Sequence, residues 1–159
     1  MHEVTIYADG ACSGNGRGQA PGGWAAIIAH AESGRSRELS GGELDTTNQR
    51  MEILAVIEGL RALTKPCTVT VRSDSAYVVN CICQGWYRKW RRNGWLNSKK
   101  DPVANQDLWE LLLDCIEKRG HTVSFEKVQG HADLLGRASS PEERLNQRCD
   151  ELAVAAVPV

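Results

Sequence analysis

Three acidic residues stand where predicted secondary-structure elements end or begin. Asp9 ends the strand-like residues 3–9, and Asp74 follows the strand-like residues 68–72. Between them, Glu52 lies at the start of a long helical pattern. Sheets covered by helices tend to place ligands beyond the carboxyl ends of their strands, so these side chains are expected to gather at one edge. Carboxylate oxygens are the ligands that Mg²⁺ and Mn²⁺ prefer, which points to metal-dependent chemistry on a phosphodiester.

The spacing of apolar residues predicts an α/β fold. Alternation typical of strands is found at residues 3–9, 24–29, 35–40, 68–72 and 122–128. Helical spacing or helix-start signals are found at residues 48–63, 75–83, 86–90 and 108–115, and from Ser140 onward. The first three strands are joined by short turns, which suits an antiparallel meander, and the later strands are separated by helices. We therefore expect a mixed five-stranded sheet, three antiparallel strands plus parallel strands, with helices on both faces.

The length and the charge pattern limit the organisation of the chain. A length of 159 residues predicts one domain, residues 1–159, that is large enough to bury a core. The formal net charge of −1 conceals an uneven distribution, because no acidic residue lies between Asp74 and Asp101. The same interval holds six basic residues: Arg88, Lys89, Arg91, Arg92, Lys99 and Lys100. We expect a basic lobe that is separate from the acidic site.

The cysteines are expected to be reduced thiols in a cytoplasmic protein. Cys115 and Cys149 fall at apolar helical positions, and no secretion signal or membrane-spanning run is recognisable. Cys81 and Cys83 have neither a matching second pair for zinc nor the spacing of a redox dithiol. The sequence therefore argues against a disulfide scaffold, a zinc protein and a membrane protein.

Each of the three acids, taken singly, has an ordinary structural explanation. Asp9 suits a turn, Glu52 complements a helix N-terminus and Asp74 suits an N-cap. A fourth acid, Asp150, lies four residues after Asn146, so the two share one face of the last helix. Crowded carboxylates repel one another unless a cation or a proton compensates them, so the joint placement predicts metal. Two ions about 3.5–4 Å apart would activate water and stabilise the leaving oxygen.

Five motifs in order resemble type 1 ribonuclease H, the bacterial ribonuclease HI family: Asp9-Gly10, residues 47–52, residues 70–75, Gly130-His131 and residues 146–153. The resemblance implies the ribonuclease H-like fold and endonucleolytic hydrolysis of the RNA strand of RNA–DNA hybrids. The products would carry 5′-phosphate and 3′-hydroxyl ends. The resemblance assigns two Mg²⁺ ions, with Mn²⁺ as a possible substitute, to Asp9, Glu52, Asp74 and Asp150. His131 matches a histidine that transfers protons and assists product release.

The same resemblance assigns the contacts with the hybrid. The RNA 2′-hydroxyl distinguishes the two strands, and amide groups suit its recognition. Residues that match this side of the site, or lie beside it, are Cys12, Asn15, Asn48, Gln49 and Asn146. Residues 86–95 resemble a basic protrusion called the handle, where Trp86 and Trp90, together with Tyr77, would line a channel for the DNA strand. Its cations would bind phosphates with little sequence readout, so that cleavage is largely sequence-independent: Arg88, Lys89, Arg91 and Arg92.

One departure from the family pattern concerns a pocket that grips a DNA phosphate in some members. Thr47 and Asn105 match residues of that pocket, but Asp45 stands where those members have an arginine. A carboxylate repels a phosphate, so the pocket is expected to be weaker or built differently.

Two further interpretations remain open from the sequence. Another nuclease or strand-transfer enzyme of the same acid-cluster superfamily is disfavoured by Asn48, Gln49 and the basic tryptophan segment, which suit a hybrid. A non-catalytic nucleic-acid-binding module would be expected to have lost at least one of the four acids. A monomer is the expected state, because no apolar stripe is left unaccounted for.

Overall fold

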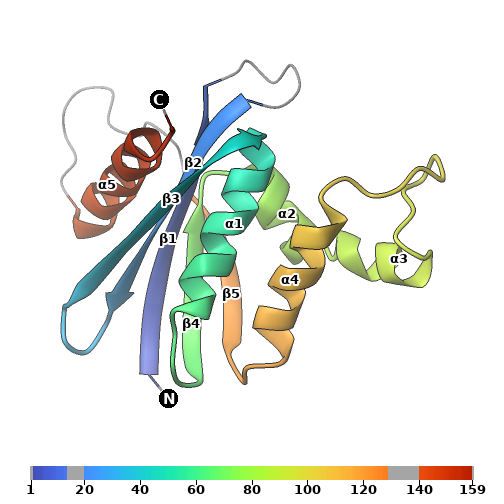
Figure 1. The fold of residues 1–159 in the computed structure, drawn as a ribbon. Helices are drawn as coiled ribbons and strands as arrows, with labels where there is room; N and C mark the ends of the chain where they lie inside the picture. Colours follow the sequence, from blue (N-terminus) through green and yellow to red (C-terminus); the bar gives the residue numbers. More distant parts are fainter. Residues whose placement is uncertain (1, 14–19, 129–139, 159) are drawn as a thin grey trace.

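The computed structural model describes residues 2–13, 20–128 and 140–158 of the chain (Figure 1). The strands are β1 (His2–Cys12), β2 (Ala20–His30), β3 (Ser36–Thr46), β4 (Cys67–Ser73) and β5 (Thr122–Lys127). The helices are α1 (Asn48–Arg61), α2 (Ala76–Cys83), α3 (Trp86–Arg92), α4 (Gln106–Glu117) and α5 (Pro141–Ala155). The order of strands and helices is the one that the apolar spacing predicts.

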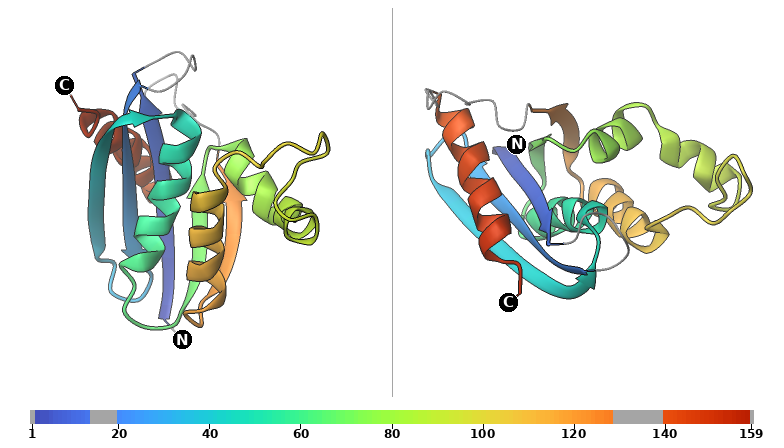
Figure 2. Two further views of the ribbon diagram at one scale, coloured as in Figure 1. Left: turned by 45° about the vertical axis from the view of Figure 1, so that its right-hand side comes forward. Right: turned by 90° about the horizontal axis from the view of Figure 1, so that it is seen from above.

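The strands form one mixed sheet in the order β3-β2-β1-β4-β5. β1, β2 and β3 pair in antiparallel fashion, and β4 pairs in parallel with β1 and with β5. The predicted five-stranded mixed sheet is therefore confirmed. α5 covers one face of the sheet, and α1 and α4 cover the other, as the view from above in Figure 2 shows.

The alternation of β1 divides the core into two layers. Ile6 belongs to a large apolar cluster that is formed mainly with α1, β4 and α4. Tyr7, the next residue, belongs to a smaller cluster with Cys149 and Ala153 of α5. Continuing this alternation places Asp9 on the side of the sheet that α5 covers.

The first three strands are longer than the sequence predicts: β1 continues past Asp9 to Cys12, and β2 begins at Ala20 rather than at residue 24. β3 continues to Thr46, although the alternation predicts an end near residue 40. Its side chains are mostly exposed, so burial imposes little apolar pattern on that edge strand. α3 has no buried residue and projects away from the body of the protein (Figure 1).

Most of the cysteines are packed in the interior of the protein. All six cysteines are free. Cys67, Cys81, Cys115 and Cys149 are buried, where they act as small apolar side chains. Within the described ranges, no helix has the length and apolar character needed to cross a membrane.

β1 and α1 approach each other closely at Gly10. A Cβ atom on Gly10 would lie 2.6 Å from the backbone N of Glu52 and 2.8 Å from the backbone C of Met51. These distances are shorter than normal contacts, so only glycine allows the first turns of α1 to lie against β1 here. The absence of this one methyl group therefore sets how near Glu52 lies to Asp9.

The substitution Gly10→Ala is expected to lower the free energy of unfolding by about 3 kcal/mol, the upper end of the usual cost of overpacking, because the added methyl meets backbone atoms. Urea unfolding measures the loss. Gly34→Ala is the matched control: nothing lies within 4 Å of its Cβ position, and its φ of +70° adds only the backbone cost of about 1–2 kcal/mol. A loss at Gly10 no larger than that at Gly34 would contradict the close approach.

Candidate active site

Asp9 is a buried carboxylate near the end of β1. Only 8% of the residue is exposed, and its Oδ1 accepts a hydrogen bond of 2.9 Å from the Gly10 N–H. Burial raises the pKa of Asp9 to about 8, and the nearby carboxylates of Asp74 and Asp150 add to the rise. The Gly10 N–H opposes this shift only in part. At neutral pH, Asp9 therefore needs a compensating positive charge, either a proton or a cation.

Glu52 lies in the second turn of α1 and is 9% exposed. Its Oε1 accepts a hydrogen bond of 3.0 Å from Nδ2 of Asn48, one helical turn earlier. Burial raises the pKa of Glu52 to about 7; a hydrogen bond with Ser75 opposes the rise, and the charge of Asp74 adds to it. Asn48 and Ser75 thus hold the Glu52 carboxylate in place without neutralising it.

Asp74 connects the two buried acids. It directly follows β4, the parallel neighbour of β1, and its charge raises the pKa of both Asp9 and Glu52. Ser75, rather than Asp74, caps α2, because the Ser75 Oγ accepts a hydrogen bond of 3.2 Å from the Val78 N–H. The Asp74 side chain is therefore not the cap of this helix.

Asp150 belongs to α5, which covers the face of the sheet opposite to α1, and it lies beside Asp9. The preceding residue, Cys149, is fully buried, and its Sγ lies 3.3 Å from the carbonyl oxygens of both Tyr7 and Ala25. These thiol contacts hold α5 against β1 and β2. Asp150 then lies close enough to Asp9 that it helps to raise the pKa of the Asp9 carboxyl group.

The four predicted acids therefore interact in pairs: Asp9 with Asp74, Asp9 with Asp150, and Glu52 with Asp74. In the part of the chain that the structure describes, no group of three or more His, Cys, Asp or Glu side chains is arranged so that it could hold a metal ion. Metal binding by these four acids accordingly stays a prediction.

The other residues predicted beside the acids have mixed environments. Cys12 is partly buried, with its Sγ 3.7 Å from the carbonyl oxygen of Ala20. Thr47 caps α1, because its Oγ1 accepts a hydrogen bond of 3.2 Å from the Arg50 N–H. Asn48 and Gln49 are exposed in the first turn of α1, and Asn146 is half-buried on α5. Asn15 and His131 lie outside the described residues.

Arg50 is a residue that the sequence analysis missed. Its guanidinium donates two hydrogen bonds to the Asp107 carboxylate, of 3.0 and 2.8 Å, and one of 3.4 Å to the Asn105 Oδ1. Asn105 Nδ2 in turn donates to the Tyr77 hydroxyl at 3.3 Å, and so does the Trp109 indole at 3.0 Å. This network joins α1, α2 and α4 and fixes the orientation of the Asn105 amide.

The same network concerns the predicted phosphate pocket, in which this chain has Asp45 where some family members have an arginine. Asp45 is exposed on β3, while Arg50 lies three residues after Thr47 and contacts Asn105. A different arginine therefore stands between the two residues of the predicted phosphate pocket. Arg50 and Asn105 are far apart in the sequence, so no sequence pattern predicted this contact.

Among the described residues, the handle is attached to the body by aromatic rings and by an ion pair. Trp90 lies 6.4 Å from Trp86, 6.1 Å from Trp95 and 6.0 Å from Trp109, measured between ring centroids. The Arg91 guanidinium donates two hydrogen bonds to Glu117 of α4, of 3.0 and 2.7 Å. Glu117 therefore holds the Arg91 side chain against α4.

The cations of the handle differ in their surroundings. Arg88 lies over the Tyr87 ring, 5.6 Å from its centroid. Lys89 and Arg92 are exposed, and neither has an acidic partner within the described ranges. Lys89 and Arg92 are therefore the cations most accessible to a phosphate backbone.

Known proteins resemble this chain over nearly its whole length. The family model described as RNase H matches residues 1–158. The ribonuclease H of Moorella thermoacetica is 54% identical over 157 residues, which cover 99% of this chain and 93% of that protein. The ribonuclease H of Symbiobacterium thermophilum is also 54% identical, covering 99% of this chain and 96% of that protein.

A solved ribonuclease H structure has the same fold as this chain. LC9-RNase H1, a type 1 ribonuclease H with the type 2 active-site motif, superposes with a TM-score of 0.80 at 31% identity, covering 99% of this chain and 72% of that chain. The sheet order and its covering helices define the ribonuclease H-like fold, with Asp9 inside the last part of β1 and Asp74 directly after β4. The chain belongs to the ribonuclease H family, and within it to type 1.

Replacing Asp9 by Asn is expected to stabilise the metal-free protein at pH 8 by roughly 1–3 kcal/mol and to have little effect near pH 4. The pKa of Asp9 rises from 3.8 to about 8 on folding, so between these values the folded chain holds a proton that the unfolded chain releases. Stability therefore falls as the pH rises from 4 to 8, and Asn removes that fall.

Urea unfolding in EDTA at pH 5, 6.5 and 8 measures this effect. Asp101→Asn, at an exposed position, is the matched control and is expected to leave the pH profile unchanged. A gain for Asp9→Asn that is the same at every pH would show that burial does not raise the Asp9 pKa.

Proposed function

We propose that this chain is an endonuclease that hydrolyses the RNA strand of RNA–DNA hybrids and leaves 5′-phosphate and 3′-hydroxyl ends. Membership of the ribonuclease H family supports the substrate class. The observation that carries the reaction is the pair of buried carboxylates, Asp9 and Glu52, whose pKa values are raised beside Asp74. Groups perturbed in this way cluster at catalytic sites.

The cofactor that suits these side chains is Mg²⁺, as two ions, with Mn²⁺ as a substitute. Asp9, Glu52, Asp74 and Asp150 would hold it, since hard divalent cations prefer carboxylate oxygens. Neither Asp9 nor Glu52 forms a salt bridge with a lysine or arginine in the described residues, so their charge is left for a cation. When bound, the ions supply an activated water and stabilise the developing charge on the phosphate.

The residues around the acids have separate tasks in this proposal. Asn48 and Ser75 orient the Glu52 carboxylate, and the Gly10 N–H orients that of Asp9. His131 carries protons to and from the site, because the pKa of histidine lies near neutrality. Its position is outside the described residues, so this role rests on the sequence motif alone.

The proposed hybrid lies between the acids and the handle. Cys12, Asn15, Asn48, Gln49 and Asn146 contact the RNA strand, where amides recognise the 2′-hydroxyl. Tyr77, Trp86 and Trp90 receive the DNA strand, and Arg88, Lys89 and Arg92 bind its phosphates without reading sequence. Thr47 and Asn105 hold a DNA phosphate, and Arg50 orients the Asn105 amide for it. Arg91 contributes by fastening the handle to α4 through Glu117.

The proposed enzyme acts as a monomer in the cytoplasm, with residues 1–159 as one ribonuclease H domain. Reduced thiols suit that compartment, and all six cysteines are free. RNA–DNA hybrids arise there during replication and transcription.

Cleavage is expected to fall by at least a hundredfold in Asp9→Asn, while hybrid binding stays within about threefold of wild type. End-labelled RNA–DNA hybrid, RNA–RNA and DNA–DNA duplexes, each with Mg²⁺ and with EDTA, measure strand choice and metal dependence. Asp101→Asn is again the control and is expected to cleave normally. Retained turnover in Asp9→Asn would reject the assignment of Asp9, and hybrid binding by the wild type without cleavage would indicate a non-catalytic module.

Removing both accessible cations, Lys89→Ala with Arg92→Ala, is expected to raise KM for the hybrid about tenfold with kcat within twofold. The dependence of log affinity on log salt should lose about one unit per cation removed. Arg35→Ala with Arg61→Ala removes the same charge far from the handle and should change neither quantity. An unchanged KM in the handle variant would mean that the handle does not bind the hybrid.

A further inference from the structure

α3 ends at an asparagine followed by a glycine, Asn93-Gly94, and both residues are exposed. The turn is part of a Schellman motif: Gly94 has a φ of +68°, and the Trp95 N–H donates to the Trp90 carbonyl oxygen at 2.6 Å. The full motif has a second hydrogen bond, from the N–H of the glycine to the carbonyl oxygen of Arg91. That bond is missing, and the Gly94 N–H donates to no other group among the described residues. The backbone nitrogen of Gly94 is therefore free to react.

The Asn93 side chain is not restrained either. Its backbone N–H donates to the carbonyl oxygens of Lys89 and Trp90, but its side-chain amide takes part in none of the hydrogen bonds found among the described residues. A Cβ atom on Gly94 would meet no described atom within 4 Å, so no neighbouring group obstructs this peptide bond. An amide carbon and the next backbone nitrogen are the two groups that can close a succinimide ring, and here the fold holds neither of them.

A second asparagine in the same region has a restrained side chain. Asn97 precedes Ser98, another small residue, in the loop after α3. Its Oδ1 accepts hydrogen bonds from the N–H groups of Lys99 at 2.9 Å and of Asp101 at 3.0 Å. These turn contacts must break before the amide carbon of Asn97 can meet the Ser98 nitrogen. The structure therefore distinguishes two asparagines that the sequence alone would group together.

We propose that Asn93-Gly94 is a site of spontaneous covalent modification that lowers the affinity of the handle for nucleic acid. The Gly94 nitrogen attacks Cγ of Asn93, the new N–Cγ bond closes a succinimide ring, and the Cγ–Nδ2 bond breaks. Ammonia leaves with the proton of the Gly94 N–H. Water then opens the ring at one of its two carbonyl groups, which gives aspartate or isoaspartate, so that the whole sequence exchanges an amide for a carboxylate without oxidation or reduction.

The product places a carboxylate among the cations of the handle. Lys89 lies one helical turn before Asn93, so the two share one side of α3, and Arg92 is adjacent in the sequence. These are the two cations of the handle that have no acidic partner in an ion pair among the described residues. A negative charge beside them weakens the attraction of a phosphate backbone. This consequence rests on the proposed function, whereas the reaction itself does not.

The first test follows the reaction without nucleic acid. The folded full chain is kept at 37 °C and pH 8.5 for several days, and peptide mapping by mass spectrometry measures the exchange of amide for carboxyl at each asparagine. We expect Asn93 to react about tenfold faster than Asn97, whose two hydrogen bonds must break first. The rate at Asn93 should rise with pH, because the attacking nitrogen has to lose its proton.

Two comparisons make this test specific. In urea the difference between the two sites should shrink, because Asn97 loses its hydrogen bonds. Asn93→Gln should stay unmodified at position 93 over the same days, because its side chain would have to close a six-membered ring. An Asn93 that stays intact in the folded chain, or that reacts only in urea, would overturn the proposal.

The second test measures the consequence for hybrid binding in EDTA. The aged chain and Asn93→Asp, which has the charge of the product, are expected to bind the RNA–DNA hybrid about threefold more weakly than the fresh chain at low salt. Asn15-Gly16 lies outside the described residues and can react in the same way. Aged Asn93→Gln retains that pair, so any loss of affinity in this variant is subtracted.

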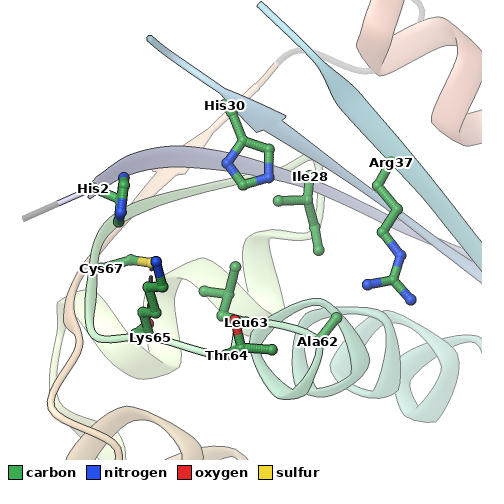
Figure 3. Close-up of a pocket in the computed structure, with 9 residues that line it drawn as sticks. All are labelled: His2, Ile28, His30, Arg37, Ala62, Leu63, Thr64, Lys65 and Cys67. Atoms are coloured by element: carbon green, nitrogen blue, oxygen red, sulfur yellow. Dashed lines mark hydrogen bonds between the residues drawn. The ribbon is translucent and has the colours of Figure 1, made fainter. Parts of the chain in front are cut away.

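Thr64→Asp is the matched control for the added charge. Figure 3 shows Thr64 beside Arg37, Leu63 and Lys65 at a cavity of about 330 Å³, which none of residues 86–95 lines. The variant therefore adds one carboxylate near two cations away from the handle, and it should bind the hybrid like the wild type.

Equal affinity of the modified and the fresh chain would overturn the consequence. Lys89→Ala with Arg92→Ala then separates this failure from a failure of the proposed function. Weak binding by that double variant would mean that only the effect of the new carboxylate is wrong. Normal binding would mean that the handle does not bind the hybrid at all.

Discussion

The burial of Asp9 beside other carboxylates is the constraint on which the rest of this structure depends. Removing a carboxylate from water raises its pKa, and two further acids at short range raise it again. The folded chain therefore places its least favourable charges together, at the junction of β1, α1, β4 and α5. A protein stores such an unfavourable arrangement where a ligand or a reaction uses it.

The surrounding residues hold the acids close without cancelling their charge. Gly10 lets α1 lie against β1, Ser75 and Asn48 hydrogen-bond with Glu52, and Cys149 fastens α5 through two carbonyl contacts. Each of these groups is neutral. Had a lysine or arginine filled the same space, the site would be compensated from within and would have little affinity for a cation.

Much of the fold could be predicted from the sequence, because periodicity reports burial directly. The strands and helices, their order and the mixed sheet all follow from apolar spacing and from the lengths of the connections. The end of β3 could not be predicted, since an exposed edge strand carries little apolar alternation. Asp9, Glu52 and Asp74 were found because they lie near the end or start of an element, whereas Asp150, in the middle of α5, was found from its spacing to Asn146 and from its motif.

Contacts between residues far apart in sequence gave no such signal. Arg50 with Asp107 and Asn105, Arg91 with Glu117, and Arg148 with Glu38 depend on how helices pack, and exposed charges have many alternative partners. The cavity around Leu63 was likewise hidden, because its lining comes from four separate segments. Arg91 illustrates the consequence: the sequence suggests a phosphate contact, and only the packing places Glu117 beside the same guanidinium.

The melting temperature of wild type and of Asp9→Asn against MgCl₂ concentration at pH 8 measures most directly whether the buried acids form a site for divalent cations. Mg²⁺ is expected to raise the wild-type Tm in a saturable manner, because a cation that binds only the folded chain stabilises it. The rise should be smaller at pH 6, where protons compete, and largely lost in Asp9→Asn. An equal response of the two proteins to Mg²⁺ would show that Asp9 does not bind the cation.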